Sequence, residues 1–507
     1  MYELGDHCGQ EGDVPMRENN VKLKRVLGFS ATYGAAMGLV VSGTAMFSVT
    51  QVAGQSGFYV WLTALIGLIP ILCAAMAFSE LSAMLPGGGM ISDYTNPALG
   101  RFWGTLAVLG TYVLLAAADG STQMAMSGFS LQDVTGIPAI VTSLVFLVAC
   151  LLFNLFDVGL YGKVAAVLPL AMMAAYFLLA VLGICGVGEY MGVAHEFGND
   201  ALPAAGWKGV FSAVGPSIWW YIGFENCCPM AEETKAPHKT IHRALFSALL
   251  SIFLIDILFS VASLKYTDIH VLLTSGISHI DGARAMMGKT GAVIMSAITI
   301  LASFTTANSQ LAALPRMFYG LARQEQLPKA FGYIHPKFRI PLVGTLTCFA
   351  LMLLSTIYIC HEGGDADIMT MFINIVCVAW LGCYILAMID VLVLRKKYPD
   401  FPRLFKVPCA PAVFAIGITF SLYAVFTMRN EIPYTLVWLA IVAAFIVIWN
   451  RSRGRKANEC SKLEDAVIMI RERTEYLPVW DEAVAEWLEK RNGSARVTNG
   501  ISTGKRE

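Results

Sequence analysis

Long apolar segments alternate with short polar loops along most of this chain. A helix needs roughly 20 mostly apolar residues to cross a bilayer, because every backbone donor and acceptor must be paired within it. Twelve segments meet this requirement. They are residues 28–50, 58–83, 101–127, 138–155, 163–186, 207–231, 241–264, 288–312, 340–360, 367–394, 408–428 and 433–450. The pattern therefore predicts an all-α membrane protein with twelve transmembrane helices, and the even number places both chain ends on one side.

The two ends of the chain lack this apolar pattern. Residues 1–27 precede the first span and begin with a polar stretch. Residues 451–507 are charged, with apolar residues at helical spacing at Leu463, Val467 and Ile470. This periodicity predicts amphipathic helices in a C-terminal tail. We expect the tail to be a surface or docking element, with a regulatory role as the alternative.

Composition favours a membrane protein over a soluble one. The 507 residues are 56% hydrophobic and 14% charged, with a mean hydropathy of +0.61, whereas soluble domains average about 25% charged residues. Lys and Arg total 36, as do Asp and Glu, so no basic excess favours nucleic-acid binding. Most cysteines lie within apolar segments, where they are typical of small core residues and not of disulfides or metal ligands.

The distribution of Lys and Arg among the loops predicts which side the ends face, because these residues resist translocation. If the N-terminus is cytoplasmic, only five of them fall in outer loops, leaving the distal tail aside. The five are Lys208, Lys265, Arg284, Lys289 and Arg429. We therefore predict a multi-pass protein of the plasma membrane with both termini in the cytoplasm.

The first predicted span is interrupted by small and polar residues, namely Ser42, Gly43 and Thr44, and we expect it to unwind over Val41–Thr44. Glycine inside a helix costs about 1 kcal/mol relative to alanine. Unwinding here would expose backbone amides and helix ends that can bind a charged substrate. Alternatively, the small residues permit close packing of neighbouring helices, and spacing alone leaves both interpretations open.

The sixth predicted span contains an acidic residue, Glu225, next to Gly223 and Pro229. Even low insertion scales assign an acid at a helix centre a cost of about 2.5–3.5 kcal/mol. We therefore expect Glu225 to face the interior and to bind substrate or a coupling ion, although it could instead only stabilise a kink. Aromatic rings beside it can contact a cation through their faces. These candidates are Trp219, Trp220 and Tyr221.

Interruptions in spans one and six predict an internal repeat. In transporters built from inverted repeats, discontinuous helices at corresponding positions meet near the middle of the membrane. Two five-helix repeats would cover about residues 28–186 and 207–394, with two further helices in about 408–450. The prediction is a five-plus-five inverted repeat within a transporter domain of residues 28–450.

Other polar residues in the spans carry weaker hypotheses. Lys163 either anchors the fifth helix at the inner interface or lines the pathway. Ser303 and Thr306 offer hydroxyls that could hold sodium against an unwound first helix, although such hydroxyls more often bond carbonyls of their own helix. The remaining acids are predicted to be paired structural groups. They are Asp119, Asp256 and Asp390.

No catalytic arrangement stands out in the loops. Neither a Ser-His-Asp set nor a metal-ligand spacing is evident there. We therefore predict that the chain is not an enzyme and needs no metal or other cofactor. The long charged tail leaves a membrane sensor without transport as a competing class.

Four loops carry sequence signatures in a fixed order. They are Glu80-Leu81 with Pro86-Gly-Gly-Gly89 after span two, Ala231-Glu-Glu-Thr-Lys-Ala-Pro237 after span six, Arg316-Met-Phe-Tyr-Gly320 after span eight and Leu394-Arg-Lys-Lys397 after span ten. Together they resemble loops of the amino acid/polyamine/organocation (APC) superfamily of secondary transporters, over roughly residues 25–450. One such loop would be a weak match, whereas four in order are a strong one.

This resemblance implies the five-plus-five fold and amino acids or amines as substrates. It further implies that backbone amides at Ser42, Gly43 and Thr44 bind the substrate carboxylate, and that Trp219 and Glu225 lie in the site. The first helix has Ser-Gly-Thr where the superfamily commonly has Gly-Ser-Gly. A shorter match, Gly38-Leu-Val-Val-Ser-Gly43 with Ile218-Trp-Trp220, resembles the ethanolamine permeases, whose substrate has no carboxylate.

The leading prediction is a permease that moves an amino acid or small amine across the plasma membrane by alternating access. Because Glu225 could bind either the substrate ammonium or a proton, we expect proton coupling or exchange, with sodium as an alternative. The expected partners are the small substrate, protons and the lipid bilayer, with no nucleic acid. The sequence makes no prediction of oligomeric state.

Overall fold

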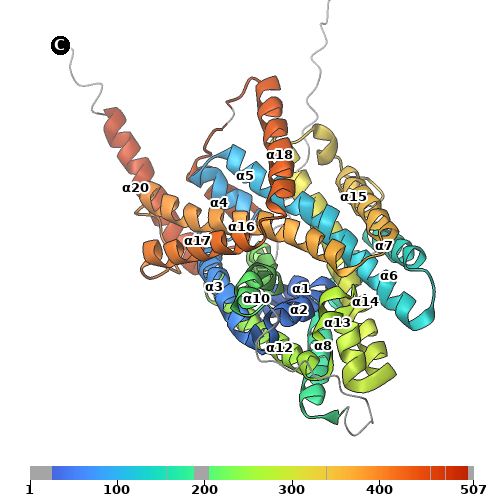
Figure 1. Cartoon of the computed structure of the whole chain (residues 1–507). Coiled ribbons are helices and arrows are strands. Elements are labelled where there is room, and N and C mark those ends of the chain that lie inside the picture. Colours follow the sequence, from blue (N-terminus) through green and yellow to red (C-terminus); the bar gives the residue numbers. More distant parts are fainter. Residues whose placement is uncertain are drawn as a thin grey trace, which may run out of the picture.

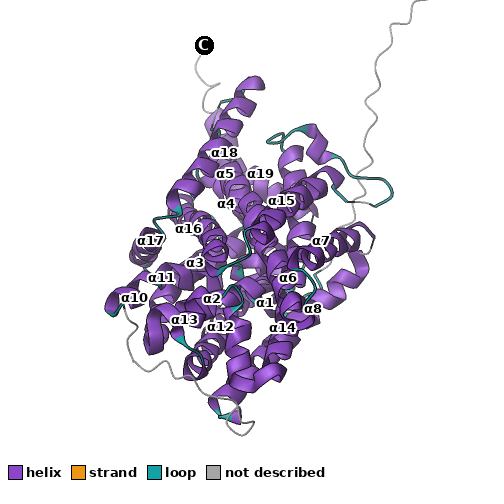
Figure 2. Cartoon of the chain, turned by 45° about the vertical axis from the view of Figure 1, so that its right-hand side comes forward, coloured by secondary structure: helices purple, strands orange, loops and turns teal. Residues whose placement is uncertain are grey.

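The computed structural model of the chain consists of packed helices (Figure 1, Figure 2). It describes residues 25–156, 158–187, 205–338, 340–456, 458–473 and 475–500. Within these ranges, β pairing is limited to an isolated bridge between Leu27 and Thr234. The prediction of an all-helical chain is confirmed for the part that the structure describes.

The described α-helices are α1 (Phe29–Val40), α2 (Gly43–Ser56), α3 (Val60–Met84), α4 (Ile91–Ala98), α5 (Arg101–Ala107), α6 (Ser121–Thr135), α7 (Ala139–Phe156), α8 (Val158–Ile184), α10 (Trp207–Ser212), α11 (Val214–Ile218), α12 (Pro237–Tyr266), α13 (Ile269–Thr274), α14 (Ser278–Arg323), α15 (Leu342–His361), α16 (Ala366–Lys397), α17 (Ala410–Thr427), α18 (Ile432–Ser452), α19 (Leu463–Arg473) and α20 (Pro478–Gly500). Short tighter or wider helical segments join or interrupt them. These are η1 (Gly57–Tyr59), η2 (Val108–Tyr112), η3 (Leu115–Gly120), η4 (Trp219–Tyr221), η5 (Phe224–Glu232) and η6 (Lys329–Gly332).

Eight helical segments of the described chain are long and apolar enough to cross a membrane. Three further apolar helices are shorter, at Phe29–Val40, Ala139–Leu155 and Leu168–Ile184. The segments α10 to η5, which cover the predicted sixth span, are too short individually to qualify. These findings support a multi-pass membrane protein, whereas the count of twelve spans and the repeat topology stay predictions.

Apolar side chains cover parts of the outside of the bundle as well as its core. On α18, Val437, Ile441 and Ile448 are each at least 58% exposed. In water such a surface would favour association, whereas lipid supplies an apolar surrounding for it. The exposed pattern therefore agrees with a helix that faces the bilayer.

The first predicted span is split where its small and polar residues lie. α1 ends at Val40, and α2 begins at Gly43. Val41 and Ser42 between them have extended backbone angles, so the helical hydrogen-bond ladder stops and restarts. Both helices lie near the centre of the bundle (Figure 1), and Thr44 in the first turn of α2 is fully buried.

The sixth predicted span is interrupted at Ile222 and Gly223. Ile222 is extended, and Gly223 has a φ of +101°, a conformation that favours glycine because it has no Cβ. A Cβ at this position would also lie 2.7 Å from the Leu39 side chain. The second interruption therefore lies against the end of α1, close to the first.

The eighth predicted span corresponds to the second part of α14. Non-helical backbone angles at Met287 and Gly288 divide this helix. The first part approaches the end of α12, where a Cβ at Gly282 would lie 3.0 Å from the Ser263 hydroxyl. The second part continues from the bend toward the centre of the bundle and carries Ser303.

The C-terminal tail packs against one end of the bundle through α19 and α20. Leu463 and Trp480 are at most 1% exposed, and the Trp480 indole donates to the Met84 carbonyl at the end of α3 (2.9 Å). Before α1, the Arg25 guanidinium donates to the Glu475 carbonyl (3.1 Å). We call this end of the bundle the tail side and the opposite end the far side.

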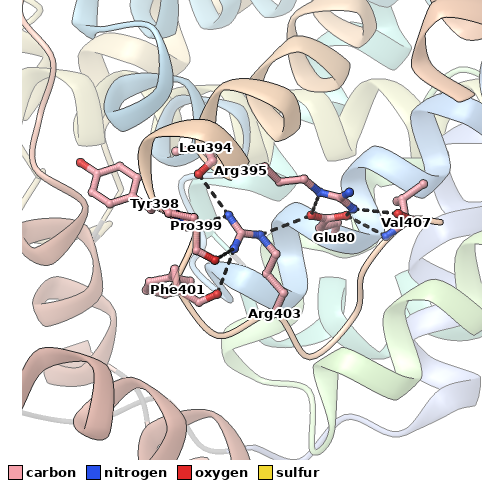
Figure 3. Close-up of polar contacts among 8 residues, drawn as sticks. All are labelled: Glu80, Leu394, Arg395, Tyr398, Pro399, Phe401, Arg403 and Val407. Carbon is pink, nitrogen blue, oxygen red and sulfur yellow. Dashed lines mark hydrogen bonds and ion pairs between the residues drawn. The ribbon is translucent and has the colours of Figure 1, made fainter. Parts of the chain in front are cut away.

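A buried ion-paired cluster joins α3 to the loop after α16 on the tail side (Figure 3). Arg395 donates twice to Glu80, from Nε to Oε1 (2.8 Å) and from Nη2 to Oε2 (2.5 Å). The Val407 amide also donates to Oε2 (2.8 Å). Arg403 lies 3.5 Å from Oε1 and bonds loop carbonyls, including that of Phe401. Glu80 of the first loop signature thus fastens the α16–α17 loop to α3.

Candidate functional site

The start of α2 presents polar groups in the interior of the bundle. The Ser42 hydroxyl caps this helix by accepting from the Ala45 amide (3.2 Å). It also lies 3.3 Å from the Thr44 hydroxyl. The positive end of the helix dipole and the first amides of α2 are therefore directed at the gap after α1.

Thr44 connects this gap to three other helical segments, η3, α6 and η4. Its hydroxyl donates to Asp119 Oδ1 (2.9 Å) and accepts from the Gln123 amide group (2.7 Å). The Trp219 indole N–H also donates to it, at 3.2 Å. The two interrupted segments are thus joined by a hydrogen bond between Thr44 and Trp219.

Asp119 extends the network to α14. Its Oδ1 accepts from Gln123 as well as from Thr44 (3.0 and 2.9 Å), and its Oδ2 accepts from Gln310 (2.6 Å). Asp119 belongs to η3, a wider helical turn of the kind often found at functional sites. We predicted a paired structural acid here and did not place it at the helix break. The local signal was Gln123, which follows at the spacing that puts two polar residues on one helix face.

Ser303 on α14 lies directly against Gly43. A Cβ at Gly43 would collide with the Ser303 hydroxyl and would approach the Thr299 methyl group at 3.1 Å. The hydroxyls of Ser303 and Thr306 are buried and have no hydrogen-bond partner among the residues that the structure describes. The glycine therefore permits the first helix break and α14 to touch, as the hypothesis of a site between them requires.

Glu225 forms a second polar cluster, with α16. The carboxylate accepts from the Trp380 indole at Oε1 and from the Tyr384 hydroxyl at Oε2, both at 2.6 Å. The Glu225 side chain is fully buried, and the Tyr384 ring also packs against Phe224. Glu225 thus faces the interior, and the sequence analysis did not identify its partners.

The three predicted aromatic contacts point to different places. Trp219 bonds Thr44 at the helix break. Tyr221 instead donates to the Ala64 carbonyl of α3 (3.2 Å). Trp220 is fully buried, and its indole N–H has no partner in the described part of the chain. Of the three, Trp219 is therefore the residue that the structure brings to the first interruption.

Lys163, the predicted gating residue of span five, is described only by its backbone. The backbone of Lys163 belongs to α8, but its side chain lies outside the described residues. Its role as an anchor or as a lining cation stays a prediction.

The sequence from residue 27 to residue 456 matches the family model described as amino acid permease. The chain belongs to the amino acid permease family. The match covers most of the chain and includes both helix interruptions. Because this family consists of transporters, the predictions of a permease and of a protein that is not an enzyme are confirmed.

Curated relatives of this permease align over most of its length. The branched-chain amino acid permease BcaP of Bacillus subtilis (strain 168) is 24% identical over 85% of this chain and 94% of its own. The serine/threonine exchanger SteT of the same bacterium is 25% identical, over 79% and 90%. A methylthioribose transporter, also of B. subtilis, is 25% identical over 82% and 91%.

Proposed function

We propose that this permease moves a small amino acid across the plasma membrane by alternating access, with a substrate site where the interrupted segments meet. The observation that carries this proposal is the Thr44–Trp219 hydrogen bond, which joins the start of α2 to η4 (3.2 Å). The relatives include an amino acid permease and an amino acid exchanger. Their names support the substrate class and leave the individual substrate open.

In this proposal the first turn of α2 binds the substrate carboxylate through the amides at Ser42, Gly43 and Thr44. Anions are favoured at a helix N-terminus because free amides and the helix dipole both point at them. The Trp219 ring would contact the substrate ammonium, with a gain of roughly 0.5–2 kcal/mol depending on desolvation. Val41 would contribute its backbone to the gap between the two helices.

Glu225 is the proposed coupling acid. Its bonds to Trp380 and Tyr384 come from neutral donors, so no fixed positive charge holds it ionised. A carboxyl in that setting can take and release a proton while the tyrosine hydroxyl reorients. We propose proton-coupled transport or exchange, with a sodium ion held between Gly43 and the hydroxyls of Ser303 and Thr306 as the alternative.

The proposed architecture is a five-plus-five inverted repeat with twelve spans. The helix breaks that meet at Leu39 and Gly223 support this topology, since inverted repeats place discontinuous helices face to face. The excess of Lys and Arg in alternate loops supports a cytoplasmic position for the tail side and for both termini.

Substituting Trp219 tests the proposed site. We expect Trp219→Ala to raise the apparent KM for the transported amino acid by about tenfold, a change that corresponds to about 1.4 kcal/mol. The assay is uptake into proteoliposomes that contain the purified permease. Trp449→Ala, a tryptophan on the peripheral α18, is the matched control. Equal KM values for both variants would exclude Trp219 from the site, and substrate binding without uptake would favour a membrane sensor.

The structure also favours a second substrate class, a small amine that lacks a carboxylate. The Asp119 carboxylate is bonded to Thr44 and therefore lies beside the proposed site. An ionised acid there would attract an ammonium group and repel a carboxylate. In addition, the Thr44 amide, one of the proposed carboxylate donors, already donates to Gln123 Oε1 (3.4 Å), which leaves fewer free donors for a carboxylate. Both observations agree with the sequence match to ethanolamine permeases.

Counterflow distinguishes the two substrate classes. Proteoliposomes loaded with unlabelled alanine or ethanolamine are given the labelled compound outside. If the substrate is an amine, ethanolamine exchanges and alanine does not, and Asp119→Asn removes this preference. Exchange of alanine alone would exclude the second class.

A further inference from the structure

A row of buried polar groups follows one face of α12 toward the far side. Asp256, Ser260, Ser263 and Thr267 are spaced by four, three and four residues, which places them on one face of a helix. All four are at most 4% exposed. Asp256 Oδ2 and the three hydroxyls have no hydrogen-bond partner within the described chain. Buried polar atoms are usually paired with protein or ordered water, so this row needs an explanation.

The groups around Asp256 do not include a compensating positive charge. Tyr176 of α8 packs its ring on Phe259, one turn from Asp256 (centroids 4.7 Å), and its buried, neutral hydroxyl lies beside the Asp256 carboxyl and interacts with it. Among the described residues, the ionisable side chains that interact with the carboxyl are the neutral Tyr176 and Tyr221. Lys163 is thirteen residues from Tyr176 along α8, about 20 Å of helix rise.

The other helices packed on α12 present few ionisable groups to this row: the acid of α3, Glu80, is paired with Arg395, and α2 carries no acid or base. On α1, the Tyr33 hydroxyl is bonded to Ser251, more than one turn toward the tail side (2.8 Å). On η5, Glu225 is directed at α16 through its bonds to Trp380 and Tyr384. Asp256 is therefore not paired with a described base from these elements.

The polar row continues across to α14, which packs beside α8 and α12 (Figure 1, Figure 2). Gly282 on the first part of α14 faces this row, because a Cβ at Gly282 would lie 3.0 Å from the Ser263 hydroxyl and 4.0 Å from the Thr267 hydroxyl. One turn earlier, the Nδ1 of His279 has no partner among the described residues, and its Nε2 bonds the Thr299 hydroxyl (3.0 Å). Thr299 contacts Gly43 at the first helix break. Polar groups thus lead from the far end of α12 toward the candidate site.

Asp256 differs in this respect from the other buried acids. Asp119 accepts three hydrogen bonds from neutral side chains, and Glu225 accepts two. Asp390 accepts one, from the Thr95 hydroxyl (2.6 Å). Among the described residues, Asp256 Oδ2 has no partner, and the neighbouring Tyr176 hydroxyl is uncharged. An ionised carboxylate without a counter-charge is very costly in a protein interior. Asp256 is therefore suited to exist as the neutral acid and to ionise only when water reaches it.

We propose that Asp256 carries a coupling proton, delivered from the far side by water along Ser260, Ser263 and Thr267. A hydronium ion transfers its proton to the carboxylate, leaving water and a neutral acid, and the acid releases the proton to water after the site opens to the tail side. Hydroxyls suit this path because each can donate and accept. The inference rests on the proposed function of proton-coupled transport. It assigns the coupling proton to Asp256, either together with Glu225 or instead of Glu225.

The test separates exchange from proton coupling. Wild-type permease and Asp256→Asn are reconstituted, and two rates are measured for the same labelled substrate: counterflow without a gradient, and accumulation driven by a pH gradient. Asparagine resembles the neutral acid in size and polarity, so we expect Asp256→Asn to keep counterflow and to lose accumulation down to the level of empty liposomes. Asp390→Asn is the matched control and should keep both.

Each outcome bears on a defined claim. Gradient-driven accumulation by Asp256→Asn, or wild-type accumulation that requires a sodium gradient and ignores pH, would overturn the inference. Absence of wild-type counterflow with every amino acid and amine would overturn the proposed function itself. If Asp256→Asn does not fold, Thr267→Val tests the entrance of the path. It should slow pH-driven accumulation and leave counterflow unchanged, and equal loss of both rates would count against the path.

Discussion

Two buried glutamates in this permease have opposite kinds of partner. Glu80, on the tail side, is paired with the guanidinium of Arg395 through two hydrogen bonds. Glu225, at the second helix break, is bonded to the indole of Trp380 and the hydroxyl of Tyr384. Both carboxyls are at most 1% exposed, so burial does not distinguish them. The difference is the charge of the donors.

This difference separates a structural acid from one that can change state. A guanidinium stays protonated in proteins, so it stabilises Glu80 only as a carboxylate and fixes the α16–α17 loop on α3. Tyrosine can donate to a carboxylate or accept from a carboxylic acid, so the pair around Glu225 is compatible with both forms. For these two glutamates, the charged partner lies where two helices are fastened together, and the neutral partners lie where a helix is interrupted.

Removing the guanidinium should produce the largest effect. Arg395→Ala leaves Glu80 buried without its main counter-charge, and breaking a buried ion pair in this way costs about 3–5 kcal/mol. We expect a correspondingly large drop in thermal stability of the detergent-solubilised protein, measured by tryptophan fluorescence. Arg429→Ala, an arginine over the Phe426 ring, is the control. Similar stabilities for both variants would contradict a structural role for the Glu80 pair.

The tail should depend on the loop that the ion pair holds. The Trp487 ring of α20 packs on Phe401 in that loop (centroids 4.9 Å) and is 7% exposed. Trp487→Ala removes this burial, at a cost of about 2 kcal/mol, and leaves the pair of Glu80 and Arg395 intact. Limited proteolysis should then cleave α20 faster than in the wild type. An unchanged cleavage rate would show that the loop does not hold the tail.

Local chemistry in the sequence predicted the positions of both helix breaks. Backbone without a helical ladder needs small or polar residues, and these stood out at Ser42 and Gly43 against an apolar span. Gly223 also stood out in the sequence as a glycine beside Glu225 in the sixth span, and the structure places it in a conformation that favours glycine. The amphipathic rhythm of the tail was local too, and α19 lies over Leu463, Val467 and Ile470, where this rhythm predicted a helix. These features depend on residues within one or two turns of each other.

The partners of the polar residues could not be predicted in the same way. Glu225 meets Trp380 and Tyr384, which are 155 and 159 positions away in the sequence. Apolar periodicity places a residue on a helix face but does not say which other helix faces it. For the same reason, Asp119 was expected to be paired, but its position beside Thr44 was not foreseen. Lys163, whose side chain lies outside the described residues, keeps its predicted alternatives.

Replacing the carboxyl of Glu225 by an amide should affect transport more than stability. Glu225→Gln keeps the size of the side chain, but its amide N–H groups then face one of the two hydrogen-bond donors, Trp380 or Tyr384. The lost hydrogen bond should lower the free energy of unfolding by about 1–2 kcal/mol. The protein should therefore remain inserted and folded, while substrate uptake is lost or no longer depends on pH. The measurement is uptake into proteoliposomes across a pH series. Uptake and pH dependence like those of the wild type would remove Glu225 from the coupling mechanism.

The smallest expected effect comes from removing a single neutral donor. Tyr384→Phe deletes the hydroxyl that bonds Glu225 Oε2 and leaves Trp380 in place, so the stability loss should be about 1 kcal/mol. Tyr423→Phe, which loses a bond to the Phe211 carbonyl (3.0 Å), is matched in chemistry and remote from Glu225. We expect the pH profile of uptake to change in Tyr384→Phe alone, because only this hydroxyl touches the proposed coupling acid. If both variants lose the same stability and share the wild-type profile, the neutral donors around Glu225 are structural, and the contrast with Glu80 concerns stability alone.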